Sequence, residues 1–429
     1  MLARILFYYF RTQRLKERFT SREQLQAYQN KQFQVLVKNT LRHAPFYNQY
    51  LNLPFQEWPI INKQIMNEHF DAINTVRLKK ADALNCALLA EETRDFTPLI
   101  DSVSVGLSSG TSGQRGLFLA SSRERDAWAG CILAKMLPNG LRTKERIAFF
   151  LRANSPIYTT INKSRKIAFH FFDLLDDFDQ HIARLNTLKP TIVSAPASVL
   201  KALALQKKQL TFQPRKICSV AEVLEPTDED FISSTFGLPV AQVYQATEGF
   251  LAASDKITNQ LVLNEEFLIV EKEWIDEHRF VPVITDLMRR TQPIVRYRLD
   301  DVLVIKKPSG VFTELSAIEG RLGDVCYGKQ GADLVPIFAD TLRQYMARSP
   351  IAFNDYFICQ KNLSEFSIQV SPEVREKQRL IDHLNQLFIH KGCELPKWTW
   401  QVYEHKEKSA KKRRIQSQFD GSPICFSKG

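Results

Sequence analysis

The chain has 429 residues, of which 44% are hydrophobic and 24% are charged. A chain of this length and composition is neither too small nor too polar to bury a core. Its length suggests two or three domains, and no apolar run approaches the roughly 18 residues that a membrane span needs. The seven scattered cysteines form no CxxC unit, and the eight histidines form no HExxH arrangement. These patterns indicate reduced thiols, a cytoplasmic location and no transition-metal site.

The net charge of +11 is an excess that often marks a polyanionic partner, but it could equally serve ATP or an acidic carrier protein. Six of the nine residues from 406 to 414 are Lys or Arg, and such a run is usually a solvated tail. Near the start of the sequence, the apolar residues 5–10 lie between basic ones. We expect these residues to form a helix that packs on its own domain rather than one that contacts a membrane.

Strands and helices are expected to alternate in the middle of the chain. Before them, Thr20 and Glu23 have capping-box spacing ahead of a helical stripe at 33–41. Helices are then expected at 197–207 and 227–236, and buried strands at 147–151, 191–195, 216–220 and 240–244. This alternation predicts right-handed crossovers and a mainly parallel sheet. Residues 267–274 and 279–286 are expected to add an antiparallel portion.

A smaller domain is expected after Gly320, where the pattern changes. Strand-like runs at 355–359 and 365–370 precede a long helix, and a last strand is expected at 398–403. The helix has marked ends and an apolar face: Ser371 and Pro372 at its start, Gly392 at its end, and Ile381, Leu384, Leu387 and Phe388 along the face. The predicted class is α/β. A large N-terminal domain (1–319) has mainly parallel sheets plus an antiparallel portion, and a small mobile C-terminal α+β domain spans 320–429.

Five short segments carry residues suited to nucleotide chemistry. Residues 108–113 are all Ser, Thr or Gly, and such a loop can fold its N–H groups around phosphates, although it lacks the P-loop pattern. In 244–248 (YQATE), after a predicted strand, an aromatic ring could stack on a base and a carboxylate could hold Mg²⁺. The other three are 293–301 (PIVRYRLDD), 320–324 (GRLGD) and 409–415 (SAKKRRI). Each alone is weak, because linkers and surface charge clusters share these compositions.

Together and in this order, the five segments resemble motifs of the adenylate-forming superfamily, which includes acyl-CoA ligases, peptide-synthetase adenylation domains and luciferases. Residues 43–47 (HAPFY), 58–63 (WPIINK) and 285–298 look like hallmarks of its phenylacetate–CoA ligase branch. One subgroup of that branch is related to the enzyme that adenylylates a deazaflavin cofactor. The resemblance covers residues from about 35 to 415.

The resemblance implies a nucleotide-binding role for each matching residue of the large domain. Tyr244 would stack on adenine, opposite the backbone of Ala221 and Glu222. Thr247 would contact the α-phosphate, and Glu248 would ligate Mg²⁺ and take part in catalysis. The residues that would hold the leaving β- and γ-phosphates are Ser108, Ser109, Gly110, Thr111, Ser112 and Gly113.

The resemblance also implies roles for residues farther along the chain. Asp301 would bind the ribose hydroxyls, with Asp300 as the alternative, and Arg321 would meet ribose or phosphate. Lys411 would be the catalytic lysine on the small domain, bridging the attacking carboxylate and the α-phosphate. A carboxylate and a phosphate repel each other as anions, so a cation placed between them lowers the barrier to attack.

The sequence departs from the family pattern at several positions. Arg115 and Gly116 stand where phosphate loops often end in Pro-Lys, and Arg115 could replace the missing cation. Gln245 stands in place of a glycine after the adenine-stacking aromatic. Gly323 occupies the hinge position, where glycine can absorb a large backbone rotation. These departures put efficiency and acceptor choice in doubt more than the fold.

The acid would lie between the strand ends and the adenine site, near Trp128, Phe149, Arg152, Pro196 and Ser219. Core packing is the competing interpretation for Trp128 and Phe149, and a surface ion pair is the competing one for Arg152. In related enzymes the acid is aromatic, but this sequence does not identify it. A homodimer is compatible with the sequence.

The implied activity is an ATP- and Mg²⁺-dependent activation of a carboxylic acid as its acyl-AMP, followed by transfer to a thiol of CoA or of an acidic acyl carrier protein. Two alternatives stay open. One is transfer of AMP to a hydroxyl of a cofactor-like acceptor. The other is a non-catalytic nucleotide sensor or nucleic-acid binder. Nucleic acid is not expected as a partner, because residues 406–414 contain no aromatic side chain for base stacking.

Overall fold

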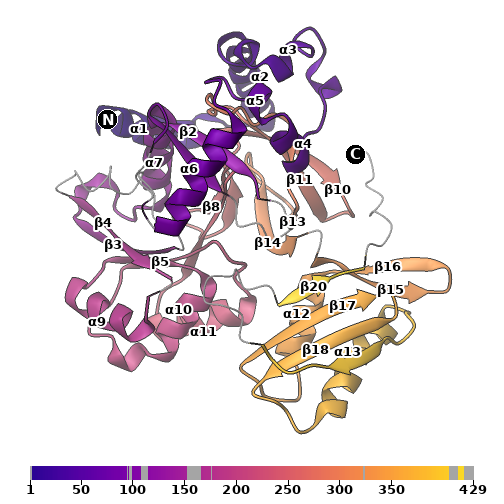
Figure 1. Cartoon of the computed structure of the whole chain (residues 1–429). Coiled ribbons are helices and arrows are strands. Elements are labelled where there is room, and N and C mark those ends of the chain that lie inside the picture. Colours follow the sequence, from indigo (N-terminus) through magenta and orange to yellow (C-terminus); the bar gives the residue numbers. More distant parts are fainter. Residues whose placement is uncertain are drawn as a thin grey trace. The chain divides into compact units, whose positions relative to one another are not determined.

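The computed structural model describes residues 2–93, 95, 99–107, 115–151, 166–174, 176–321, 324–404 and 414–419 (Figure 1). Contacts divide the chain into two compact units. The first comprises Met1–Glu271, Val283–Leu299 and Ile305–Ser316, and the second Lys272–Pro282, Asp300–Val304 and Ala317–Gly429. The predicted division into domains 1–319 and 320–429 stays a prediction.

In the first unit, helices α1 to α6 precede the first strand, and the later helices alternate with strands. The α-helices are α1 (Leu2–Arg18), α2 (Arg22–Asn39), α3 (Pro45–Asn48), α4 (Lys63–Glu68), α5 (Phe70–Ile73), α6 (Lys80–Thr93), α7 (Ser122–Met136), α9 (Phe178–Leu188), α10 (Ala197–Leu205) and α11 (Pro226–Phe236). Single 3₁₀ turns are η1 (Leu41–His43), η2 (Phe55–Glu57), η3 (Gly140–Arg142) and η4 (Lys207–Gln209). Among the described helices, none combines the length and apolarity needed to cross a membrane.

Two sheets are built from the strands up to residue 321. The strands are β1 (Val103–Leu107), β2 (Leu117–Ser121), β3 (Glu145–Leu151), β4 (Ile167–Asp173), β5 (Ile192–Ala195), β6 (Lys216–Val220), β7 (Val240–Ala246), β8 (Gly249–Ser254), β9 (Leu261–Leu263), β10 (Leu268–Trp274), β11 (Arg279–Asp286), β12 (Tyr297–Arg298), β13 (Asp301–Ile305) and β14 (Glu314–Arg321). Strands β1 and β2 form an antiparallel hairpin by themselves.

The other strands form a mixed sheet, 12-stranded over the described residues. Its order is β10-β11-β13-β14-β9-β8-β7-β6-β5-β3-β4, with β12 beside β11. Strands β7, β6, β5, β3 and β4 pair in parallel, whereas β7–β8, β8–β9, β9–β14 and β11–β13 pair antiparallel. The predicted α/β class, with a parallel sheet and an added antiparallel portion, is confirmed.

Helices cover both faces of the parallel strands, as a parallel sheet requires. Successive residues point to opposite faces: Ile192 of β5 belongs to the core beneath α1 and α7, and Val193 belongs to the core beneath α9, α10 and α11. Figure 1 shows α9, α10 and α11 together below the sheet and α7 on its other side. The four predicted strands correspond to β3, β5, β6 and β7. Their predicted starts agree with the structure to within one residue, except that β3 begins two residues earlier than predicted.

The cap of α2 differs from the sequence prediction by one residue. Helix α2 begins at Arg22, and the Ser21 hydroxyl accepts a hydrogen bond from the Gln24 backbone N–H. The Thr20 hydroxyl instead contacts the side chain of Gln24. The expected capping box at Thr20 is therefore wrong.

Glycine at position 130 lets α1 lie against α7 at very short distance. A Cβ atom at Gly130 would lie 2.5 Å from the Ile5 carbonyl oxygen and 2.7 Å from the Tyr8 Cβ. We expect Gly130→Ala to lower the free energy of unfolding by about 1–3 kcal/mol, because backbone must move to admit the methyl group. Urea denaturation measures this, with Gly106→Ala as control, since a Cβ at Gly106 meets nothing within 4 Å. Equal stability of the two variants would contradict the prediction.

The second unit contains a small sheet of its own. Its remaining elements are β15 (Cys326–Gln330), β16 (Asp333–Ile337), α12 (Ala339–Ala347), β17 (Asp355–Asn362), β18 (Glu365–Ser371), α13 (Lys377–His390), β19 (Lys397–Trp400) and β20 (Ile415–Ser417). The four-stranded order is β19-β18-β17-β20, and β15 pairs with β16. Side chains of α12, α13, β17 and β18 form one apolar core.

The start of the long helix is not where the sequence suggested. Ser371 ends β18, paired with Asp355, and α13 begins only at Lys377, so the predicted cap at Ser371 is wrong. The strand ladder already uses the backbone of Ser371, and this tertiary pairing outweighs its capping preference. Gly392 does follow the helix end with φ +68°, a conformation that favours glycine. The most buried face contains Leu380 rather than the expected Ile381.

Candidate functional site

The carboxyl ends of three neighbouring parallel strands bring predicted site residues to one edge of the sheet. Pro196 follows β5, Ala221 and Glu222 follow β6, and Tyr244 lies near the end of β7. Val220 pairs with Val243, so Ala221 lies beside Tyr244 across the two strands. In open α/β sheets, ligands bind at this edge. The structure therefore brings together the residues expected to flank adenine.

The backbone turns sharply at Ala221. Its φ is +65°, and the Glu222 N–H donates to the Val220 carbonyl at 2.8 Å, which closes a three-residue turn. A left-handed conformation at a residue other than glycine costs roughly 1–3 kcal/mol and is found most often at functional sites. The Glu222 carboxylate accepts a hydrogen bond from the Ser198 N–H (3.0 Å), which caps α10. Its side chain is therefore engaged, and its backbone is what can face a ligand.

Thr247 and Glu248 form the two-residue loop between β7 and β8, because Ala246 pairs with Gly249. The Thr247 hydroxyl donates to a Glu248 carboxylate oxygen at 2.8 Å, and Glu248 is only 7% exposed. Behind the loop, the Arg289 guanidinium donates to the Thr247 carbonyl at 3.4 Å. The pair that would meet the α-phosphate and a metal ion is thus fixed by neighbouring side chains.

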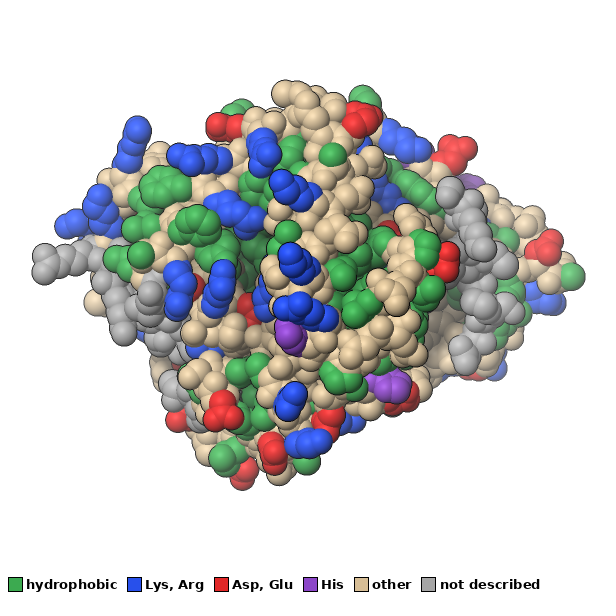
Figure 2. All heavy atoms as spheres, turned by 90° about the horizontal axis from the view of Figure 1, so that it is seen from above, with side chains coloured by type: hydrophobic (Ala, Val, Ile, Leu, Met, Phe, Trp, Pro, Cys, Tyr) green, Lys and Arg blue, Asp and Glu red, His purple; other side chains and the backbone are tan. Residues whose placement is uncertain are grey.

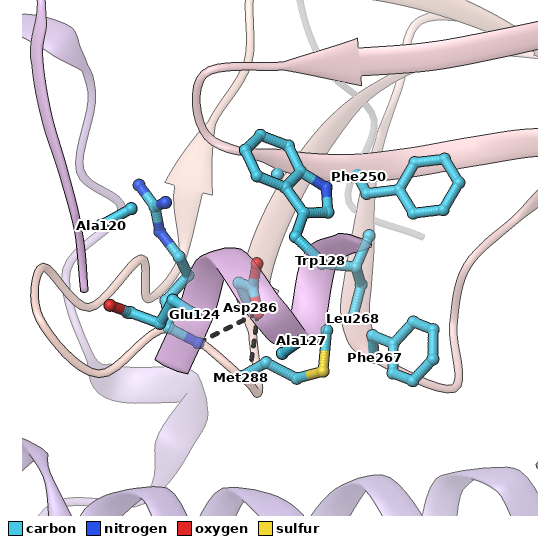
Figure 3. A pocket seen from close by; sticks show the side chains of 11 residues that line it. Ala120, Glu124, Ala127, Trp128, Phe250, Phe267, Leu268, Asp286 and Met288 are labelled. Atoms are coloured by element: carbon cyan, nitrogen blue, oxygen red, sulfur yellow. Dashed lines mark hydrogen bonds between the residues drawn. The ribbon is translucent and has the colours of Figure 1, made fainter. Parts of the chain in front are cut away.

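A pocket lies directly behind this loop, within the first unit (Figure 3). It has an empty volume of about 480 Å³, part of it open to solvent. In Figure 3, Trp128, Phe250, Leu268 and Phe267 form one side, and the carboxylates of Glu124 and Asp286 lie on the other. Two buried donor atoms of this pocket, Trp128 Nε1 and Arg289 Nε, have no hydrogen-bond partner among the described residues.

Charge in the pocket is divided between one arginine and two carboxylates. Burial raises the pKa of Asp286 to about 6, although the Arg289 charge and the N–H groups of Met288 and Arg289 oppose this shift. Burial also acts to raise the pKa of Glu124, but Arg289 and hydrogen bonds from Ser121, Thr291 and the Arg290 N–H lower it overall. Glu124 therefore stays ionised at pH values where Asp286 has taken up its proton.

The raised pKa of Asp286 predicts a pH-dependent change in stability. The folded chain holds this proton more tightly than the unfolded chain, whose carboxyl titrates near 3.8. Wild-type stability is therefore expected to fall, relative to Asp286→Asn, by about 2 kcal/mol between pH 4 and pH 7. The asparagine oxygen can still accept the two N–H bonds. Urea denaturation across this pH range measures the difference, and parallel profiles of the two proteins would contradict it.

Sequence reasoning missed Glu124, Asp286 and Arg289. Glu124 lies far along the chain from Asp286 and Arg289, and all three lie far from residue 247. Asp286 and Arg289 lie within the 285–298 stretch, whose resemblance to the phenylacetate–CoA ligase branch could have drawn attention to them. No role was predicted from the sequence for the individual residues of that stretch.

The predicted phosphate loop, Ser108–Gly113, lies outside the described residues, but the residues on either side of it are placed. Leu107 pairs with Leu117 in the β1–β2 hairpin, so the loop connects two paired strands. The Arg115 guanidinium pairs with both oxygens of Glu91, and Asn67 donates to the Arg115 carbonyl (3.0 Å). The positive charge of Arg115 is therefore already neutralised by Glu91. This pairing counts against Arg115 as a replacement for the lysine that phosphate loops of the family often carry.

The proposed acid-binding residues are not all brought to one place. Trp128 lines the pocket behind the loop, whereas Phe149 packs against Phe169 at 6.5 Å, as the core interpretation expects. Ser219 is 2% exposed, and its hydroxyl has no hydrogen-bond partner among the described residues. Arg152 lies outside the described residues.

Asp301 and Arg321 belong to the second unit. Asp301 begins β13 and Arg321 ends the neighbouring strand β14. The Arg321 N–H donates to the Asp324 carboxylate at 3.2 Å. Gly320 has φ +115°, and a Cβ there would lie 3.2 Å from the Arg343 guanidinium, so the turn requires glycine. The proposed hinge residue Gly323 lies outside the described residues.

Asp355 holds both ends of the segment that contains Lys411. Lys411 itself lies outside the described residues. One Asp355 oxygen accepts a hydrogen bond from the Tyr403 hydroxyl, and the other accepts from the Arg414 guanidinium at 2.9 Å. Burial and this carboxylate raise the pKa of Tyr403. Residues 405–413 lie outside the described part of the chain. The described residues on either side of this segment are thus joined through one side chain.

No family model matches the chain. Among curated proteins, Protein CapK of Staphylococcus aureus is 24% identical over 162 residues, which is 37% of this chain and 35% of that protein. The match thus spans about a third of the length of that relative.

Solved structures of adenylate-forming enzymes share the fold of this chain. A 2-hydroxyisobutyryl-CoA ligase in the postadenylation state, in complex with R3-HIB-AMP, superposes with a TM-score of 0.68 at 15% identity, covering 92% of this chain and 90% of that one. The GH3.15 acyl acid amido synthetase gives a TM-score of 0.57 at 11% identity, covering 87% and 84%. At such low identity the likeness establishes the fold alone.

Proposed function

We propose that this chain uses ATP to activate a carboxylic acid as its acyl-AMP, with release of pyrophosphate, and then passes the acyl group to a thiol of CoA or of an acyl carrier protein. The finer parts of the proposal are an aromatic acid and membership of the phenylacetate–CoA ligase-like branch. Both come from the motif resemblance. A cytoplasmic location belongs to the same proposal.

One observation carries the proposal. The strained turn at Ala221, Tyr244 and the Thr247–Glu248 loop lie at neighbouring strand ends. An aromatic ring beside an exposed backbone edge suits a purine. A hydroxyl and a carboxylate on the following loop suit a phosphate and its cation.

The residues present fit Mg²⁺ bound together with ATP. Over the described residues, no cluster of three or more His, Cys, Asp or Glu could hold a metal unaided. Mg²⁺ at nucleotide sites commonly takes one or two carboxylates and completes its shell with phosphates and water. Glu248, already oriented by Thr247, supplies such a ligand. When bound, the ion would neutralise phosphate charge.

Chain residues would then perform three tasks. Tyr244 and the turn at Ala221 would hold the base, the Thr247 hydroxyl would exchange its hydrogen bond to Glu248 for one to the α-phosphate, and Lys411 would counter the charge between the two anions. Arg289 would act from behind, since it holds the Thr247 carbonyl. A backbone held in this way limits the reorganisation that the Thr247 hydroxyl needs in order to reach the phosphate.

Acid-dependent exchange of pyrophosphate into ATP tests the proposal. A panel of aryl and aliphatic acids should show exchange with a restricted set, and hydroxylamine should convert the product to a hydroxamate. No exchange with any acid, in a preparation that binds AMP, would count against carboxylate activation. A product stable to hydroxylamine that contains a phosphodiester would establish AMP transfer to a hydroxyl instead.

A further inference from the structure

The first helix has apolar side chains on two opposite faces. Ile5 and Tyr9 on one face are buried against α7, as the sequence predicted for a helix that packs on its own domain. On the other face Phe7 is 61% exposed and Phe10 is 53% exposed, and Leu2 at the same end is 53% exposed. Packing within the domain therefore does not account for Phe7 and Phe10 in the apolar run at residues 5–10.

The inner face is fixed, so α1 cannot simply roll to bury the outer one. Gly130 brings the backbone of α7 against Ile5, and Arg4 pairs with Asp126 on α7 at 2.8 Å. At the other end of the helix, Lys16 pairs with Asp255. Phe7 and Phe10 thus remain directed away from the core of the first unit.

The segment around this apolar face is strongly basic. Residues 2–43 contain nine Lys or Arg against two Asp or Glu, a net charge of +7 within a chain of net +11, and three of the nine, Arg4, Lys16 and Arg22, pair with carboxylates of other segments. Arg14 is exposed one helical turn after Phe10. Figure 2 looks onto the side of the molecule formed by the N-terminal helices, and Lys and Arg side chains lie among hydrophobic ones there, with Asp and Glu mainly near the edges.

We propose that the outer face of α1, comprising Phe7, Phe10 and Arg14, docks on the surface of an anionic phospholipid bilayer. A helix with exposed aromatic residues and flanking arginines lies in the plane of the interface, with its rings at the acyl boundary and its cations at lipid phosphates. Charge complementarity favours this partner over a second copy of the chain. A two-fold contact through α1 would bring two segments of net charge +7 together, and like charges repel.

Vesicle flotation with the full chain tests this proposal. Wild type should float with vesicles of phosphatidylcholine mixed with phosphatidylglycerol at about 0.1 M salt, and much less with phosphatidylcholine alone or at about 1 M salt. Phe7→Ser combined with Phe10→Ser should lower the partition coefficient at least about tenfold, because the apolar anchor is lost. Arg14→Glu should lower it by about tenfold on mixed vesicles only.

The matched control is Leu205→Ser combined with Ile257→Ser, which removes two apolar side chains that are 70% and 92% exposed elsewhere in the first unit. It should bind vesicles as wild type does, and all variants should melt at the wild-type temperature. Failure of wild type to float with mixed vesicles would overturn the proposal, as would equal loss in the control. So would a dimer in light scattering that the two Phe substitutions convert to a monomer. None of these outcomes depends on adenylation, so the proposed function is tested separately.

Discussion

Replacing Glu248 by glutamine is expected to lower acid-dependent ATP–pyrophosphate exchange by about 10²–10³-fold. The amide keeps the shape of the side chain and can still accept the Thr247 hydroxyl bond, so the β7–β8 loop should persist. It lacks the charge, however, that would balance a divalent cation beside the triphosphate. The concentration of Mg²⁺ at half-maximal exchange should therefore rise as well.

Two comparisons separate this effect from a loss of folding. The unfolding free energy of Glu248→Gln should remain within about 1 kcal/mol of wild type. Glu17→Gln, at an exposed position on α1, removes one carboxylate from the same unit and should leave exchange unchanged. Full exchange activity of Glu248→Gln with unaltered Mg²⁺ dependence would remove Glu248 from the site.

The parallel half of the sheet was predictable because its strands are short, apolar and separated by helices. Residues 216–220 are buried on both faces, and the run KICSV predicted β6 with the bounds the structure has. Strand β4 was missed although its sequence, IAFHFFD, is equally apolar. Helix α13 shows the opposite case, since Ser371 has the residue type of a cap but its backbone pairs within β18. Local sequence preference thus determined β6, whereas tertiary pairing of Ser371 determined that α13 begins later than predicted.

The site was predictable where its residues lie next to one another along the chain. Thr247 and Glu248 are adjacent, and their hairpin loop could be anticipated from the end of a strand. The pocket behind them could not, because its polar side chains come from α7 and from the turn after β11. Asp286 and Arg289 acquire their roles only when that turn lies against the β7–β8 loop. The spacing of residues along the sequence does not indicate that this turn and the β7–β8 loop lie against each other in the fold.

Replacing Lys411 by alanine is the second change with a large expected effect. By the motif resemblance, this lysine counters the repulsion between the acid's carboxylate and the α-phosphate. Losing one such cation should lower exchange by about 10²–10³-fold. The core of the second unit is formed by α12, α13, β17 and β18, so the unit should stay folded. Lys412→Ala removes the same charge one residue further on and should retain most of the activity.

The comparison of the two lysines separates a specific role of Lys411 from the general effect of positive charge, because the two residues are adjacent and carry the same charge. A general effect of positive charge would make both alanine variants equally slow, and that result would contradict a specific role for Lys411. A specific role also predicts that Lys411→Ala still transfers the acyl group from chemically prepared acyl-AMP to a thiol. In that second step the carboxylate–phosphate repulsion has already been overcome, so the lysine has no charge left to counter.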